Sequence, residues 1–419
     1  MSEQVDVYYE GWGERWLWGQ LMATTALGGR AQVLFEYSVQ AKQRGFELSA
    51  HQLPLAGPSL RRDFPAHQLG LPGPVYDALP DGWGMLLMNR LFKSRGLNAA
   101  RIGPLQRLAY IGDNAMGAMT FEPSAPEGKA VEEHLPLELL LAEVQEVLTG
   151  EGGEFLQTLL RLGGSPQGAR PKALIYRDPR TDCFTTAAKP DLEAWLVKFP
   201  AKDEHPEVCA VEALYADCLR LCGIQTADTR YFRLPDGQAA FATRRFDRVN
   251  GQRVPMQSLA AFTGADYQRP GTLDYINFLR ATQLCTNDVR QKAIAFERAV
   301  FNVVFNNRDD HPKNFAYLMS ATGTWTLAPA YDVTFCEGPH GYHQMDVLGE
   351  ALDIRRAALL DLADEAEVPQ TAANDIIERI GHVARQFTTI AERNYLGSIT
   401  RETLRTIQGR IDENLRLLR

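Results

Sequence analysis

The stretch NNRDDHPKNFAYLM, residues 306–319, directly follows an apolar segment with helical spacing, AFERAVFNVVFN at 295–306. Four residues separate Asp309 from Asn314. Phosphoryl transfer needs a carboxylate that takes the proton of the attacking hydroxyl and oxygen ligands that hold Mg²⁺. Two other interpretations stay open for this segment alone: a polar turn in which Asp309 and Asp310 cap a helix, and a metal site built from Asp-Asp-His.

A second acidic segment, LAPAYDVTF at 327–335, places Asp332 eighteen residues after Asn314. We expect Asp332 at the end of an apolar strand, WTLAPAYD at 325–332. Kinases carry a catalytic base and two metal ligands in this order along the chain. The ordered pair therefore predicts Asp309 as the base, with Asn314 and Asp332 as Mg²⁺ ligands.

Upstream, LGGSPQGARPKALIY at 162–176 places Gly163, Gly164 and Gly168 between a helix and a strand. Glycines let backbone N–H groups approach phosphate oxygens closely. The loop is not a Walker A motif, because Arg-Pro-Lys at 170–172 stands where that motif needs Lys-Ser/Thr. By itself, a glycine-rich turn of this kind is more often only a turn.

An alternating apolar strand, AWLVKFP at 194–200, carries Lys198 where a kinase places its phosphate-binding lysine. Lys189 is the rival for this role. In the helix that follows, we expect Glu212 to orient Lys198, because it falls within the apolar periodicity, and Glu207 is the alternative.

The order of the expected elements also indicates a kinase-like organisation. A Pro/Gly-rich acidic stretch at 122–135 predicts a domain boundary. Short strands precede it, a Gly-loop with strands and one helix follows, and helices dominate from 255 onward. The strands are expected at 5–9, 16–23, 32–38, 169–177, 194–200, 229–234 and 238–246, and the helices at 82–95, 135–150, 208–224, 275–285 and 289–306, with Gly223 as a C-cap.

Bulk composition limits the classes of function. The chain has 419 residues, enough for two or three domains. A formal net charge of −8 argues against a protein that binds nucleic acid through bulk electrostatics. No apolar run reaches the ~20 residues of a membrane span, the N-terminus does not look like a signal peptide, and six scattered cysteines show no disulfide pattern. We expect a cytoplasmic protein with no membrane contact.

These motifs together resemble the HipA family of serine/threonine kinases, the toxin components of bacterial toxin–antitoxin modules. The resemblance covers nearly the whole chain. The segments that carry it are FEYSVQAKQRGFELSAHQLPL at 35–55, ALPDGWGMLLMNRLF at 78–92, GGSPQGARPKA at 163–173, WLVKFP at 195–200, VEALYADCLRLCGI at 211–224, RRFDR at 244–248, NRDDHPKNF at 307–315 and LAPAYDVTF.

The resemblance implies roles for individual residues. Two departures from the family pattern are Arg244, where the residue is usually acidic, and Pro166 in the loop. The implied catalytic residues are Asp309, His311 and Lys313, the metal ligands are Asn314 and Asp332, the nucleotide-binding residues are Gly164, Ser165, Gly168, Ala169, Lys198, Glu212, Arg245 and Phe246, and Ser165 is the implied autophosphorylation site.

The implied fold is α+β, two-lobed and protein-kinase-like (HipA-like), with a β-rich N-terminal subdomain (1–125), a small lobe with the Gly-loop (136–250) and a helical C-lobe (251–419). The implied activity uses ATP and Mg²⁺ to phosphorylate a cellular protein, for example an aminoacyl-tRNA synthetase, and the chain itself. A helix-turn-helix antitoxin is the implied partner, with DNA contacted only through it. The alternatives are a pseudokinase that serves as a binding or co-repressor module, and a small-molecule phosphotransferase.

Overall fold

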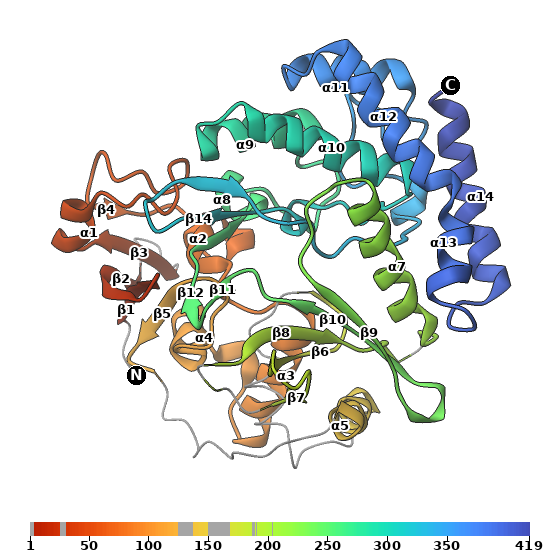
Figure 1. Ribbon diagram of the computed structural model, residues 1–419. Helices are drawn as coiled ribbons and strands as arrows, with labels where there is room; N and C mark the ends of the chain where they lie inside the picture. Colours follow the sequence, from red (N-terminus) through yellow and green to blue (C-terminus); the bar gives the residue numbers. More distant parts are fainter. Residues whose placement is uncertain are drawn as a thin grey trace. The chain divides into compact units, whose positions relative to one another are not determined.

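The computed structural model describes residues 4–25, 31–124, 137–149, 168–186, 189, 191–202 and 204–419 (Figure 1). The chain forms two compact units. The first comprises Met1–Glu204, Arg233–Gln257 and Leu318–Thr324, and the second comprises His205–Phe232, Ser258–Tyr317 and Trp325–Arg419. The expected α+β class, with a β-rich N-terminal part and a helical C-terminal region, is confirmed.

An antiparallel sheet with strand order β4-β3-β2-β1-β5 begins the first unit. Burial alternates along β1, as expected of a strand with one face on a core. Trp16 and Trp18 of β2 are both almost fully buried. The three expected N-terminal strands are confirmed. The bounds are β1 Gln4–Gly11, β2 Glu14–Thr25, β3 Ala31–Tyr37, β4 Leu60–Arg61 and β5 Met119–Glu122.

The helices of the first unit include the one expected after the Pro-Asp-Gly turn and the one expected at 135–150. Both are confirmed, as α3 and α5. The bounds are α1 Val39–Arg44, α2 Gly73–Tyr76, α3 Gly82–Ser94, α4 Pro104–Ile111 and α5 Leu137–Thr149. The expected domain boundary at 122–135 lies mostly outside the described residues.

A second sheet has the order β7-β6-β8-β10-β9, and its strands β6, β8, β9 and β10 confirm those expected at 169–177, 194–200, 229–234 and 238–246. The central strand β8 pairs antiparallel with both β6 and β10. Residues that stand directly opposite in such pairs present their side chains on the same face. The bounds are β6 Lys172–Arg177, β7 Phe184–Thr185, β8 Glu193–Lys198, β9 Thr229–Arg233 and β10 Ala239–Arg244.

The second unit is mainly helical. Helix α7 ends at Leu221 and its C-cap is Cys222, so the expected C-cap at Gly223 is displaced by one residue. Gly223 comes directly after this cap, and its φ of +72° is the left-handed conformation that follows many helix ends. The expected helices at 275–285 and 289–306 are confirmed as α9 and α10. The bounds are α7 Glu207–Leu221, α8 Leu259–Thr263, α9 Tyr275–Thr286, α10 Arg290–Val304, α11 Arg356–Glu365, α12 Gln370–Arg385, α13 Phe387–Asn394 and α14 Arg401–Leu417.

Short strands complete the structure: a two-stranded ribbon and a three-stranded sheet of order β13-β14-β15. Their bounds are β11 Arg248–Val249, β12 Gln252–Arg253, β13 Met256–Ser258, β14 Ala316–Met319 and β15 Trp325–Leu327. Among the described helices, none combines the length and the apolar character that crossing a membrane requires.

A buried ion cluster joins the N-terminal segment to the sequence after β10. The Asp247 carboxylate accepts hydrogen bonds from Arg245 at 2.7 and 2.8 Å, from Arg248 at 2.9 Å and from the backbone N–H of Gly117 at 2.8 Å. Burial alone would raise the pKa of Asp247, but the two guanidinium groups more than offset it, and the pKa lies well below its usual value.

We expect Asp247→Asn to lower the free energy of unfolding by about 3–5 kcal/mol, because it leaves two buried guanidinium groups without their counter-charge. Urea denaturation at neutral pH measures this. In the wild type, the contribution is fully present above about pH 4 and is lost as the pH falls toward the depressed folded-state pKa.

The matched control is Glu413→Gln, which removes an exposed ion-pair partner of Arg410 on α14. It should leave the denaturation midpoint unchanged. An Asp247→Asn variant as stable as this control would contradict the structural role of the cluster.

Candidate functional site

The acidic loop at 306–319 begins at the C-terminal end of helix α10. Asn306, which is fully buried, turns the chain out of the helix with a φ of +53°. Asn414 of α14 donates to the backbone oxygen of Val303 at 2.9 Å and so satisfies a carbonyl at the helix end. The start of the loop is therefore fixed by buried side chains.

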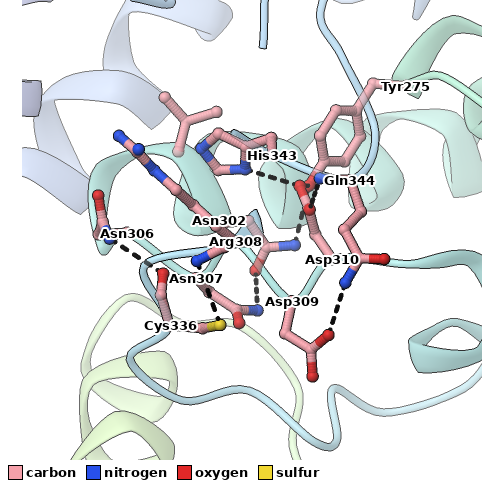
Figure 2. A network of polar contacts seen from close by, with 12 residues as sticks. Tyr275, Asn302, Asn306, Asn307, Arg308, Asp309, Asp310, Cys336, His343 and Gln344 are labelled. Carbon is pink, nitrogen blue, oxygen red and sulfur yellow. Dashed lines mark hydrogen bonds and ion pairs between the residues drawn. The ribbon is translucent and has the colours of Figure 1, made fainter. Parts of the chain in front are cut away.

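Asp310 is fully buried and accepts three hydrogen bonds. They come from the hydroxyl of Tyr275 at 2.7 Å, Nδ1 of His343 at 2.7 Å and the backbone N–H of Gln344 at 2.8 Å (Figure 2). Because an ionised carboxylate can only accept, we assign a proton to Nδ1 of His343. A buried carboxylate is tolerated only when donors surround it in this way.

The polar network continues beneath Asp310. Asn302 donates to the hydroxyl of Tyr275 at 3.0 Å, and Asn307 donates to the side-chain oxygen of Asn302 at 2.9 Å (Figure 2). Burial, together with the charge of Asp310, raises the pKa of Tyr275 well above its usual value. Tyr275 therefore stays protonated and remains a donor.

Asp309, the neighbour of this buried carboxylate, keeps 46% of its side chain exposed. The side-chain amide of Gln344 donates to its Oδ1 at 2.7 Å (Figure 2). Nε2 of His311 lies 3.7 Å from the same oxygen. Asn314 donates to the backbone oxygen of Asp309 at 2.7 Å. The carboxylate is thus both oriented and accessible, as a general base must be.

The segment that contains Asp332 runs alongside this loop. Asn306 donates through its side chain to the backbone oxygen of Cys336 at 3.0 Å (Figure 2), and its own backbone oxygen accepts from the N–H of Cys336 at 3.2 Å. The hydroxyl of Tyr331 donates to the backbone oxygen of Lys313 at 2.6 Å. The structure therefore brings the two predicted loops together.

The expectation that Asp332 ends a strand is wrong. Strand β15 ends at Leu327, five residues earlier. Pro329 has no N–H to continue a ladder, and the next N–H, that of Ala330, bonds to the backbone oxygen of Gln225 instead. Asp332 itself has a φ of +55°, a conformation that is uncommon for residues other than glycine and that gathers at functional sites.

The residues present fit a magnesium ion. Mg²⁺ is held by one or two protein oxygens together with water and phosphate oxygens, rather than by a complete protein cage. The nitrogen of the Asn314 amide is engaged by Asp309, which leaves its oxygen as the ligand atom. Within the described ranges, no cluster of three or more His, Cys, Asp or Glu residues could hold a metal ion. A Mg²⁺ site does not require such a cluster, because water and phosphate oxygens complete its coordination.

His311 and Lys313 share an aromatic neighbour that the sequence did not reveal. Nζ of Lys313, a largely buried side chain, lies 4.3 Å from the ring centre of Tyr267. The ring of His311 lies 5.5 Å from the same ring. Tyr267 therefore limits the positions that both predicted catalytic side chains can take.

The first unit carries Lys198, the predicted phosphate-binding lysine. Lys198 is buried at the end of β8, directly opposite Lys172 of β6, which is also buried. Nζ of Lys198 lies 6.0 Å from the ring centre of Phe241 on the other neighbouring strand. Lys189 precedes β8 and is exposed. Lys172 is thus a second lysine on the face of the sheet that carries Lys198.

The other predicted nucleotide-binding residues lie in different parts of the chain. Gly168 and Ala169 lie before β6, separated from its first residue by Arg170 and Pro171. Gly164 and Ser165 lie outside the described residues. Glu212 is buried in α7 of the second unit, and its pairing with Lys198 stays a prediction. The backbone N–H of Arg245, which precedes Phe246, donates to the oxygen of Ala194 at 2.9 Å. The Arg245 side chain belongs to the Asp247 cluster.

Sequence analysis missed several residues that hold the loop, namely Tyr275, His343 and Gln344. His343 and Gln344 stand in an irregular segment with no periodicity, so the sequence gives no signal for them. For Lys172 the sequence gives only a weak indication, namely that this lysine closely follows the glycines of the loop.

We expect Asp310→Asn to lower the free energy of unfolding by about 1–3 kcal/mol, because the buried donors Tyr275 and His343 share a carboxylate oxygen that the variant replaces. Asp309→Asn is the matched control, since the same change at a half-exposed neighbour should leave stability nearly unchanged. Chemical denaturation measures both. Equal stabilities for the two variants would contradict the division of roles between these carboxylates.

Comparisons with known proteins agree with this architecture. Residues 164–387 match the HipA-like C-terminal domain, and residues 14–122 match the HipA N-terminal domain. A search of curated proteins finds no match.

Two solved structures are similar to different extents. HipA in the Shewanella oneidensis MR-1 complex of HipA, HipB and operator DNA has 17% identity and a TM-score of 0.71, over 98% of this chain and 96% of that one. The Helicobacter pylori proinflammatory kinase CtkA has 13% identity over 54% of this chain and 88% of that one, with a TM-score of 0.37, too low to indicate a shared fold. The two domain matches, the first over more than half of the chain, show that the chain belongs to the HipA family.

Proposed function

We propose that this protein is an ATP- and Mg²⁺-dependent serine/threonine protein kinase and the toxin of a toxin–antitoxin module. The observation that carries the proposal is the exposure and the orientation of the Asp309 side chain. Its carboxylate is half exposed, fixed by Gln344 through Oδ1, and tied through its backbone to Asn314. An oriented, accessible carboxylate beside an amide oxygen ligand is what transfer of a phosphoryl group to a hydroxyl requires.

Each residue of the loop has a distinct role in this proposal. Asp309 accepts the proton of the serine or threonine hydroxyl, and Gln344 keeps the carboxylate in one rotamer. Asn314 and Asp332 hold Mg²⁺ through oxygen atoms. Bound there, the ion would neutralise charge on the phosphate oxygens. His311 and Lys313 lie against Tyr267 and add hydrogen-bond donors beside the base.

The paired lysines of the first unit support an anionic ligand. Lys172 and Lys198 are both buried and stand opposite one another, so their side chains lie on the same face of the sheet. Two positive charges on one face favour a ligand with negative charge, such as the phosphate oxygens of a nucleotide. We assign phosphate binding to both lysines.

Family membership supports the finer parts of the proposal. Because the similar HipA was solved with HipB and operator DNA, we infer a helix-turn-helix antitoxin as partner, with DNA contacted only through it. The substrate is a cellular protein, for example an aminoacyl-tRNA synthetase, and Ser165 is the site of autophosphorylation. Phosphoproteomics of cells that express the wild type or Asp309→Ala would identify the substrate.

The central test is Asp309→Ala. It should lower phosphoryl transfer by about 10²–10⁴-fold, the usual contribution of general-base catalysis. Asp332→Ala should abolish Mg²⁺-dependent turnover and leave the fold intact, as judged by thermal unfolding. Transfer of radiolabelled γ-phosphate measures the rates. Wild-type turnover by Asp332→Ala at saturating Mg²⁺ would show that this residue is not a metal ligand.

A second test concerns the nucleotide. Lys198→Ala should weaken ATP affinity and lower the rate, because it removes a buried charge from the phosphate-binding face. Lys189→Ala is the control and should do neither, since Lys189 is exposed and lies outside β8. ATP titrations of the initial rate distinguish the two variants, and the reverse pattern would reject Lys198 as the phosphate ligand.

A further inference from the structure

The Asp81-Gly82-Trp83 turn at the start of α3 contacts the backbone that leads from the glycine-rich segment into β6. The side-chain oxygen of Asp81 accepts a hydrogen bond from the N–H of Gly168. The N–H of Trp83 donates to the backbone oxygen of Gly168 at 3.2 Å. Both polar groups of the Gly168 residue are therefore held by one turn of the N-terminal domain.

These contacts replace the usual capping of α3. Asp81 occupies the N-cap position, where an aspartate normally accepts from its own helix, but it makes no such side-chain bond. The N–H of Trp83 is one of the donors that a helix start leaves without an internal partner. The turn thus directs both its acceptor and its donor to Gly168 rather than to its own helix.

A third bond reaches the first residue of β6. The indole Nε1 of Trp83, a side chain that is almost fully buried, donates to the backbone oxygen of Lys172 at 3.0 Å. Next to it, the oxygen of Pro171 accepts from the N–H of Phe199 at 2.9 Å, just beyond Lys198. The turn therefore fixes the backbone of the lysine that stands opposite Lys198.

The turn requires a glycine at position 82, because its backbone packs closely against that of Gly168 and Ala169. Gly82 has a φ of +39°, and a Cβ atom there would lie 2.6 Å from the backbone oxygen of Gly168 and 2.7 Å from Cα of Ala169. Contacts this short force the backbone to shift. Any side chain at position 82 would therefore push the Gly168–Ala169 backbone away from α3.

We propose that the Asp81–Trp83 turn is a positioning element for nucleotide binding, through which the N-terminal domain fixes Gly168 to Lys172 and so places the lysine pair. The inference rests on the proposed function, since it takes Lys172 and Lys198 as the phosphate-binding residues. None of the three turn residues is assigned a contact with the nucleotide. Their effect is on affinity for it.

The test measures binding of the non-hydrolysable analogue AMP-PNP with Mg²⁺ to the full chain by calorimetry. Trp83→Phe keeps a buried ring but loses the bond to Lys172, and we expect a Kd about 2–10-fold higher, the size of one neutral hydrogen bond. Gly82→Ala should raise the Kd further. With ATP, both variants should raise KM and leave kcat at saturating ATP nearly unchanged.

Two matched controls separate positioning from general destabilisation. Trp18→Phe changes an equally buried tryptophan whose Nε1 has no hydrogen-bond partner among the described residues. Gly70→Ala adds a methyl group at a φ of +70°, where nothing described lies within 4 Å. Both should bind AMP-PNP as the wild type does, and thermal unfolding should show that all four variants remain folded at the temperature of the binding assay.

The outcomes distinguish this inference from the function on which it rests. Weaker binding by Trp83→Phe than by Trp18→Phe supports the positioning role. Equal binding by these two variants overturns it and leaves the proposed kinase activity intact. Failure of the wild type to bind AMP-PNP at all would overturn the proposed function, and the positioning role with it.

Discussion

A carboxylate without access to water has to receive hydrogen bonds, and the acidic loop at 306–319 is organised around this requirement at Asp310. Its three donors come from α9, from the side chain of His343 and from the backbone of Gln344. These groups can converge only if the segment after Asp332 folds back against the loop. The buried charge therefore specifies where that segment lies, and the side chain of Gln344 reaches Asp309 as a consequence.

The first unit uses buried polar contacts in a comparable way. The Asp247 cluster joins Gly117 to the chain after β10, and the Asp81–Trp83 turn holds the chain before β6. Both contacts link the N-terminal domain to segments that flank the second sheet. This explains why the N-terminal domain and the sheet that carries Lys198 belong to one compact unit.

Local patterns in the sequence were sufficient to predict most of the elements, whereas the roles of the acidic residues in the loop stay predictions. Asp309 and Asn314 could be selected because their spacing is short and their chemistry is specific, and α3 and α10 because their apolar residues recur at helical spacing. The contact of Asp81 with Gly168 joins residues 87 positions apart. No local pattern encodes such a contact. The strand expected at Asp332 failed because Pro329 interrupts the ladder after Leu327.

Asp309 and Asp310 show why the acidic pair could not be interpreted from composition alone. One carboxylate is fully buried and satisfied by three donors, and the other is half exposed and held at one oxygen. The same short stretch therefore anchors the loop through one carboxylate and presents the other to solvent. Because burial holds Asp310 in place, its neighbour can stay accessible without losing its orientation.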